Sequence, residues 1–172
     1  MTGATDGPPS GPADRIAQLL ELVPLEHEGG RYRQMLHDGA GTAIYFLLGS
    51  DDASAWHRLP TTEVWHHYAG APVRLGALHP DGTAVEHRLG DDVFAGERPQ
   101  VVIPGGVWQG AVSTGAYSLL GTTMAPPYSD AGFELGQPPQ LRAAYPGLVE
   151  LIEVIADRSR GLWAVEEGPS GR

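Results

Sequence analysis

Residues 54–70 read SAWHRLPTTEVWHHYAG. Runs that contain tryptophan and histidine flank a break at Pro60, and the second run also holds β-branched residues, which is typical of two strands joined by a turn. Alternation along the second run places Glu63, Trp65 and His67 on one face. Indole, imidazole and carboxylate side chains at this density are unusual for a solvent-exposed strand. The segment therefore predicts part of a β-sheet that carries a functional site.

The residues that follow this segment and precede it show a similar pattern. Between residues 42 and 124, short β-rich runs alternate with turn residues, and Asp81-Gly82 is typical of a hairpin turn. About eight short strands without an interleaved helical rhythm favour an all-β sandwich, barrel or jelly roll. The predicted strands cover Thr42–Leu48, Ser54–Arg58, Glu63–Ala69, Val73–Leu78, Ala84–Leu89, Gln100–Ile103, Gln109–Val112 and Tyr117–Met124.

Helices are expected only near the two ends of this β-rich region. Apolar residues at helical spacing predict a short helix over Asp14–Leu22, ended by Pro24. A second helix is expected from Pro146 to about Asp157. The expected organisation is a disordered leader, one domain and a flexible tail, over residues 1–12, 13–160 and 161–172.

The composition excludes several classes of function. The chain has 172 residues and a formal net charge of −10, which disfavours binding to nucleic acids and anionic membranes. It contains no cysteine, which excludes thiol nucleophiles, disulfides and cysteine-ligated metals. All 11 basic residues are arginine, so Schiff-base chemistry on lysine is excluded as well. A polar N-terminus and short apolar runs predict a cytoplasmic protein without a membrane span.

The histidine and acidic residues leave three readings open. His57 lies on the strand before Glu63, so the two side chains can face each other inside a barrel. An imidazole beside a carboxylate suits general acid–base catalysis. The same pair suits two metal ligands, with His67 as a third in a facial arrangement of two histidines and one carboxylate. An aromatic and histidine network that only stabilises the barrel is the third reading.

Two motifs resemble those of the cupins. The first cupin motif, H-x-H-xxx-E-xxxxxx-G, is matched by His57, Glu63 and Gly70, but Leu59 replaces its second histidine. The second motif, P-x-G-xx-H, is matched at residues 104–109, but Gln109 replaces its histidine. Two of the four usual metal ligands are therefore altered.

The same departures are similar to those of the small single-domain cupins of cupin family five. The resemblance covers about residues 15–147. It rests on six segments: Glu28-Gly29-Gly30 with Tyr32-Arg33, Thr42–Leu48, Ser54–Arg58, Glu63–His66, Pro99–Gln109 and Pro126–Leu135. It implies a β-barrel jelly roll (a double-stranded β-helix) with a pocket at its mouth, and a homodimer. It also implies similarity to sugar-epimerase cupins, which use acid–base chemistry without a metal.

On this reading, the inner wall of the barrel forms the site. His57 is the expected general acid or base, Glu63 its orienting partner, and Gln109 the donor to a developing oxyanion. Glu28-Gly29-Gly30 is expected to be structural, because glycine pairs permit backbone geometry closed to other residues, and a place at the pocket edge is the alternative. Expected substrate contacts are Arg33, Tyr45, Trp65, His67 and Trp108. For Arg33, a salt bridge that holds the N-terminal arm is an equal alternative.

These residues predict an enzyme that moves protons on a small organic substrate, by epimerisation, isomerisation, dehydration or cyclisation. No cofactor is required in this hypothesis. One alternative is a non-catalytic binding or sensing protein. Another is an oxygenase with a divalent metal on His57, Glu63 and His67. A composition rich in arginine and free of asparagine is typical of GC-rich genomes and suggests bacterial natural-product biosynthesis. The missing lysine makes a nucleotide-sugar substrate less expected.

Overall fold

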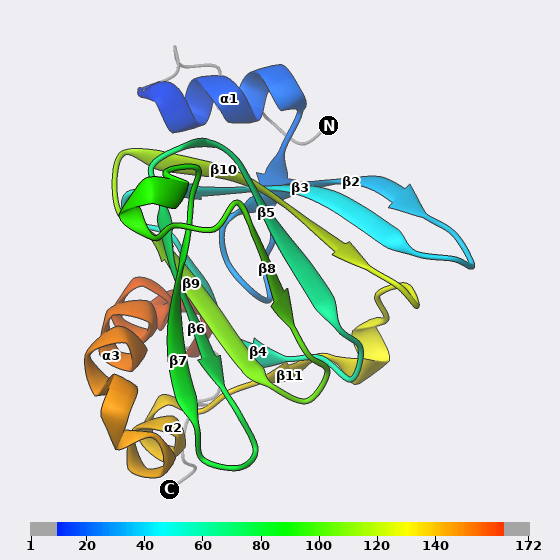
Figure 1. Ribbon diagram of the computed structural model, residues 1–172. Coiled ribbons are helices and arrows are strands. Elements are labelled where there is room, and N and C mark those ends of the chain that lie inside the picture. The colour runs from blue at the N-terminus through cyan, green and yellow to red at the C-terminus, as the bar shows by residue number, and fades with distance from the viewer. Residues whose placement is uncertain (1–9, 164–172) are drawn as a thin grey trace, which may run out of the picture.

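Two antiparallel β-sheets lie face to face in the computed structural model of the protein, in which residues 10–163 are described (Figure 1). Sheet A has the strand order β1-β2-β3-β10-β5-β8, and sheet B has the order β11-β4-β9-β6-β7. The strands are β1 (Val23–Pro24), β2 (Arg31–His37), β3 (Thr42–Gly49), β4 (Ala53–Arg58), β5 (Glu63–Gly70), β6 (Val73–Leu78), β7 (Ala84–Leu89), β8 (Gln100–Ile103), β9 (Trp108–Ser113), β10 (Tyr117–Met124) and β11 (Glu134–Leu135). Strands far apart in sequence, such as β3 and β10, are hydrogen-bonded neighbours, which is consistent with the expected jelly roll.

All of the strands expected from the sequence are present, with bounds within one residue of those predicted. The Asp81-Gly82 turn joins β6 to β7, and Gly82 adopts a φ of 91°, which favours glycine. The prediction missed β2. Five of the seven residues of this strand are exposed, so it lacks the alternating burial that marks a strand in a sequence. It also missed β1 and β11, which are two residues long.

The space between the sheets is filled by one apolar core. Inward residues of both sheets contribute to it, among them Phe46 and Trp65 from sheet A and Leu75 from sheet B. All three are fully buried. This core closes most of the barrel and leaves one end for a pocket.

Helix α1 (Pro12–Leu20) packs on the outer face of sheet A, where Ala17 and Leu22 contact Leu47 (Figure 1). The helix was predicted to run to Leu22, which is two residues too far. The helix ends at Leu20, because Glu21 adopts the left-handed conformation with a φ of 55°. Pro24 belongs to β1 instead.

The outer face of sheet B is covered by α2 (Pro138–Ala144) and α3 (Val149–Arg158), with a 3₁₀ turn, η3 (Pro146–Leu148), between them (Figure 1). The predicted second helix corresponds to α3. Helix α2 was not predicted, because its Pro138-Pro139 start is typical of a loop as well as of a first helical turn. A short helix, α4 (Arg160–Trp163), crosses the boundary at which a tail was expected. Residues 1–9 and 164–172, most of the expected leader and tail, lie outside the described residues.

The indole of Trp56 fixes the distance between sheet B and α3. The ring lies over Gly76 and Gly110, and a Cβ at Gly76 would be 2.3 Å from it. Leu151 and Ile155 of α3 pack in the same buried cluster. The glycines therefore make room for the indole under the helix.

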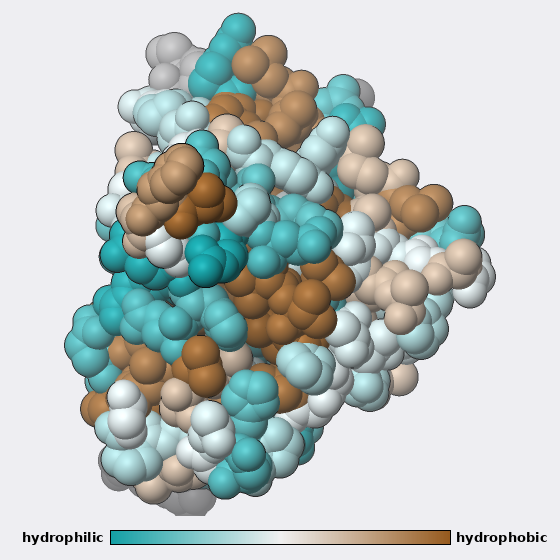
Figure 2. All heavy atoms as spheres, viewed as in Figure 1, coloured by the Kyte–Doolittle hydropathy of each residue, from teal (hydrophilic) through white to brown (hydrophobic). Residues whose placement is uncertain are grey.

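None of the helices in residues 10–163 has both the length and the apolar character needed to cross a lipid bilayer. Apolar side chains do reach the surface on the face shown in Figure 2, over the 3₁₀ turn η1 (Val93–Ala95) and over β8. Phe94 is 99% exposed, and Val102 is exposed on β8.

Candidate functional site: a carboxylate pocket in the barrel

A pocket lies over the inner face of sheet A, beside the β1–β2 loop that descends between the sheets in Figure 1. It contains about 480 Å³ of space free of atoms, including the part open to solvent. Its lining comes from the β1–β2 loop, from four strands of sheet A and from the segments after β4 and β10. The lining residues are Leu25, His27, Glu28, Tyr32, Gln34, Thr42, Ile44, Leu59, Glu63, Thr122, Met124 and Tyr128.

Glu28 reaches the pocket because of the two glycines that follow it. Gly29 and Gly30 have φ values of 101° and 69°, and a Cβ on Gly29 would lie 2.3 Å from the carbonyl oxygen of Ala53. The Glu28 carbonyl accepts a hydrogen bond from the Ala55 amide at 2.8 Å, which ties the loop to β4. The Ser54 hydroxyl donates to Glu28 Oε1 at 2.6 Å. The expected structural role of the glycines thus places an acidic side chain in the pocket.

Glu63 is the second acidic side chain of the pocket, and it is only 7% exposed. Burial, followed by the negative charge of Glu28, raises the pKa of Glu63 from 4.5 to about 7. The nearby His57 and hydrogen bonds from Thr122 and Gln109 act in the opposite direction. A carboxyl group with this pKa exists in both protonation states near neutral pH, which suits it for proton transfer.

Gln109 is fully buried and holds Glu63 in place. Its Nε2 donates to Glu63 Oε2 at 2.7 Å, and its Oε1 accepts from the indole Nε1 of Trp65 at 2.7 Å. Because an indole N–H can only donate, Trp65 fixes which end of the amide points to Glu63. Both ends of the amide are therefore engaged. Gln109 does not line the pocket and contacts Glu63 from behind, whereas the sequence predicted a donor to the substrate.

His57 pairs with a different carboxylate from the one predicted. Its Nδ1 lies 2.7 Å from the carbonyl oxygen of Ala55, so Nδ1 carries the proton and donates it. Its Nε2 lies 3.9 Å from Oε1 of Glu28. The side chain is 1% exposed and does not line the pocket. His57 therefore supports Glu28 from behind, and it influences Glu63 only through its charge.

The segment between β10 and β11 closes one side of the site. Within it, Phe133 stacks on His57 with ring centroids 5.3 Å apart and meets His27 edge-on at 4.8 Å. The Tyr128 hydroxyl lies 3.3 Å from His27 Nε2. Burial, followed by a hydrogen bond to Asp130 and the negative charge of that carboxylate, raises the pKa of Tyr128, so its phenol stays protonated. The prediction assigned no role to these residues, although the family resemblance included this segment.

Two aromatic residues expected in the pocket lie on outer faces of the sheets. Tyr45 packs in the cluster under α1, because β3 turns Ile44 inward and Tyr45 outward. Trp108 packs with the α2–α3 cluster, and the guanidinium of Arg58 lies 4.5 Å above its ring. Gln109 points inward on the same strand, so alternation directs its neighbour Trp108 outward.

Arg33 is 44% exposed in its side chain and does not line the pocket. It forms a 2.6 Å ion pair with Glu21 and donates to the carbonyl of Leu20 at 3.3 Å. The structure thus places it in the alternative role, at the end of α1.

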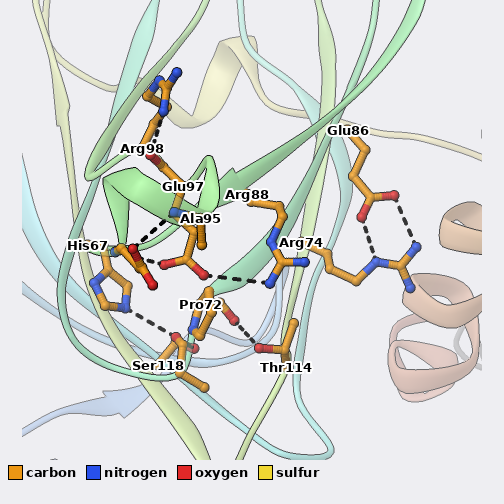
Figure 3. Close-up of polar contacts among 12 residues, drawn as sticks. His67, Pro72, Arg74, Glu86, Arg88, Ala95, Glu97, Arg98, Thr114 and Ser118 are labelled. Atoms are coloured by element: carbon orange, nitrogen blue, oxygen red, sulfur yellow. Dashed lines mark hydrogen bonds and ion pairs between the residues drawn. The ribbon is translucent and has the colours of Figure 1, made fainter.

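The two adjacent histidines of β5 face opposite sides, as predicted. His66 lies outside the barrel, 3.0 Å from the hydroxyl of Thr123. His67 belongs to the opposite end of the strand from Glu63, where its Nε2 donates to the Ala71 carbonyl at 3.1 Å. Figure 3 shows it in the polar cluster that contains Ser118 and Glu97, and His67 is not among the residues that line the pocket. Its Nδ1 is buried without a hydrogen-bond partner.

The three residues of the alternative metal site are not brought together in the structure. His57, Glu63 and His67 form no common ligand set, and no group of three acidic or histidine side chains among residues 10–163 is arranged to hold a metal ion. Glu63 is held by an amide on one side, and His67 lies beyond the core.

The chain matches the model of a known protein family. The model of the cupin superfamily family DUF985 matches residues 14–136. The chain belongs to this cupin family. The match includes the β1–β2 loop and every strand that lines the pocket. The resemblance inferred from the sequence motifs is thus confirmed.

Solved structures show the same relationship. A protein of Shewanella oneidensis is 32% identical with a TM-score of 0.77, and the match covers 83% of this chain and 96% of that one. A hypothetical protein from Leishmania major is 27% identical with a TM-score of 0.75, over 83% of this chain and 97% of that one. An oxalate decarboxylase of Bacillus subtilis is 12% identical with a TM-score of 0.52, over 78% of this chain and 37% of that one, and shares the fold alone. Among functionally curated proteins, no significant match is found.

Proposed function

We propose that this cupin is an enzyme that transfers protons on a small organic substrate, at a carbon next to a carbonyl group. The observation that carries the proposal is Glu63, a buried carboxyl group in a pocket whose pKa is raised to about 7. A general base works best when its pKa lies near the working pH. The assignment differs from the one expected from the sequence, because Glu63 takes the place of His57 as the group that meets the substrate.

The reaction begins when the ionised Glu63 removes a proton from carbon. The C–H bond breaks, its electron pair moves into the carbonyl system, and the carbonyl oxygen gains negative charge. The Tyr128 hydroxyl lines the pocket as a neutral phenol, and it exchanges its hydrogen bond to Asp130 for one to this oxygen. Gln109 keeps one oxygen of Glu63 fixed, so that the carboxylate does not need to reorganise.

The proton then returns to carbon at another position or on the other face. Glu63 can return it in a one-base isomerisation. Glu28 and His57 form a second unit that can hold a proton, with Nε2 and Oε1 3.9 Å apart. The overall change needs no oxidant or reductant. Epimerisation and isomerisation follow from this arrangement, and loss of a leaving group after the first step gives a lyase reaction.

Exchange of substrate hydrogen for deuterium tests the proposal. The purified chain is incubated in D₂O with hydroxyketones, keto acids and amino ketones, and the loss of proton signals next to the carbonyl is followed by NMR. The wild type is expected to catalyse exchange with at least one class, and Glu63→Gln to lose it. Glu153→Gln is the matched control, because Glu153 pairs with Arg142 on the surface.

Exchange that survives in Glu63→Gln would overturn the assignment. If no class exchanges in the wild type but a compound still binds the pocket, the protein is a ligand-binding cupin, and the enzymatic proposal is wrong.

A further inference from the structure

The charged side chains that line the pocket are mostly acidic. Glu28 and Glu63 both line it, whereas no arginine does, and the chain has no lysine. His27 is the one basic side chain among the lining residues. The arginines nearest in sequence are engaged outside the pocket, where Arg31 pairs with Asp14 and Arg58 with Glu134. A carboxylate or phosphate ligand would therefore meet two carboxylates, with His27 as the one basic group in the lining.

The negative charges converge inside the pocket. The charge of Glu28 reaches Glu63, and the charges of both reach the hydroxyl of Tyr128. These three side chains come from the β1–β2 loop, from β5 and from the segment after β10. Glu63 is more than nine-tenths buried, so little water screens its charge.

The remaining walls are aromatic and apolar. Tyr32 and Tyr128 contribute rings, and Leu25, Ile44 and Met124 contribute aliphatic surface. The electron-rich face of a tyrosine ring attracts ammonium groups, and the attraction increases when water is excluded. Carboxylates beside aromatic rings thus suit an organic cation better than a neutral ligand.

We propose that the pocket selects small organic cations, with an amine or ammonium group held between Glu28 and Glu63 and the apolar part against the tyrosine rings. This inference rests on the proposed function and narrows its substrate class to amine-bearing carbonyl compounds. It also explains why the pocket has no arginine, although acidic substrates are common among small metabolites.

Cation binding should depend on pH. Glu63 must be ionised to attract the cation, and the groups that face it are Glu28 from the loop, His57 from β4, Gln109 from β9 and Thr122 from β10. With a pKa of about 7, Glu63 is ionised in roughly a tenth of the molecules at pH about 6 and in roughly nine-tenths at pH about 8. The apparent affinity follows this fraction, so it should rise roughly tenfold over that range.

Three probes of matched size test the charge preference: benzylammonium, benzyl alcohol and benzoate. Their affinities for the full chain are measured by calorimetry at pH about 8. Benzylammonium is expected to bind at least about tenfold more tightly than benzyl alcohol, and benzoate more weakly than both. Glu28→Gln and Glu63→Gln should each remove the preference, whereas Glu153→Gln should keep it. The pH dependence should disappear in Glu63→Gln.

Several results would overturn the inference. One is a benzyl alcohol or benzoate affinity equal to that of benzylammonium, and another is no binding of benzylammonium at millimolar concentration. A charge preference that persists in both pocket variants would do the same. Circular dichroism checks that each variant folds, and if one does not, the other carries the test.

The two proposals fail separately. If hydroxyketones exchange deuterium but benzylammonium does not bind, the charge preference is wrong and the proton-transfer function stands. If benzylammonium binds with the expected dependence on Glu28 and pH but no compound exchanges deuterium, the preference stands and the enzymatic proposal fails.

Discussion

The two ends of the barrel differ in the partners that they provide for a buried carboxyl group. At the pocket end, Glu63 is 7% exposed and faces open space, beside the second carboxylate of Glu28. At the closed end, Glu97 is 5% exposed, but its Oε2 accepts from the Asp92 amide at 3.0 Å and its Oε1 lies 3.6 Å from Arg88 (Figure 3). The two glutamates are therefore buried to a similar degree, and they differ in their hydrogen-bonding and ionic partners.

This difference separates function from stability. A buried charge with hydrogen-bonding and ionic partners contributes to the fold, whereas a buried carboxyl beside a like charge raises the energy of its ionised form. The closed end also contains the buried Ser113–Ser118 hydroxyl pair, whose oxygens lie 2.7 Å apart. We thus expect changes at the pocket end to alter chemistry and changes at the closed end to alter folding.

The largest effect is expected from a matched pair of glutamate substitutions. Glu63→Gln should reduce deuterium exchange at least about a hundredfold, because the amide cannot accept the proton. Glu97→Gln should leave the rate within about twofold, but lower the free energy of unfolding by about 1–3 kcal/mol through its lost acceptor. NMR exchange rates and urea unfolding measure the two effects. Equal rate losses in both variants would break the distinction between the two ends.

The pH dependence of stability gives the next largest effect. The folded pKa of Glu63 is about 7 and its ordinary value is 4.5, so the folded state holds an extra proton between these values. Stability from this group is complete below about pH 4.5, falls as the pH rises, and levels off above about pH 7. The total loss is about 3 kcal/mol.

Urea unfolding of the wild type and of Glu63→Gln at pH about 5 and about 7.5 measures this loss. The variant has no titrating group at this position, so its stability should fall less than that of the wild type over the same range. A parallel fall in both proteins would show that Glu63 is ionised at ordinary pH.

Gln109→Leu should have a smaller effect at the same end. Without the N–H donor at 2.7 Å, the ionised form of Glu63 loses a stabilising hydrogen bond, so its pKa rises further. The midpoint of the exchange rate against pH should move up by about one unit, with about fivefold less exchange at neutral pH. Trp65→Phe should shift the midpoint in the same direction by less, because the amide only loses its fixed orientation. An unchanged midpoint in Gln109→Leu would exclude the positioning role.

The smallest effect is expected at the closed end. The Ser118 hydroxyl donates to the Ala71 carbonyl at 2.6 Å, so Ser118→Ala should cost about 1 kcal/mol of unfolding free energy. The midpoint of the rate against pH should stay where it is in the wild type. A shifted midpoint would mean that the two ends communicate through β10.

Individual residues show which side-chain directions could be predicted from the sequence. Alternation along β5 correctly turned His66 away from Glu63 and put Trp65 on the inner face. The same rule, applied to β9, would have removed Trp108 from the site, because Gln109 already points inward. Alternation does not predict the direction of Tyr45, since both faces of β3 are apolar. Only the packing of α1 shows which face of β3 is outside. The expected homodimer, the cytoplasmic location, the absence of a cofactor and the natural-product role stay predictions.

The sequence by itself determined eight of the eleven strands, the β6–β7 turn and the cupin family, because these depend on local periodicity and on motifs within short stretches of chain. Only the tertiary structure decided which groups meet. Glu28 reaches Glu63 through a loop whose glycines fold it against β4, and Tyr128 arrives from a segment that follows the last long strand. The raised pKa of Glu63 is likewise a tertiary property. It arises from burial and from a charge contributed by a distant part of the chain.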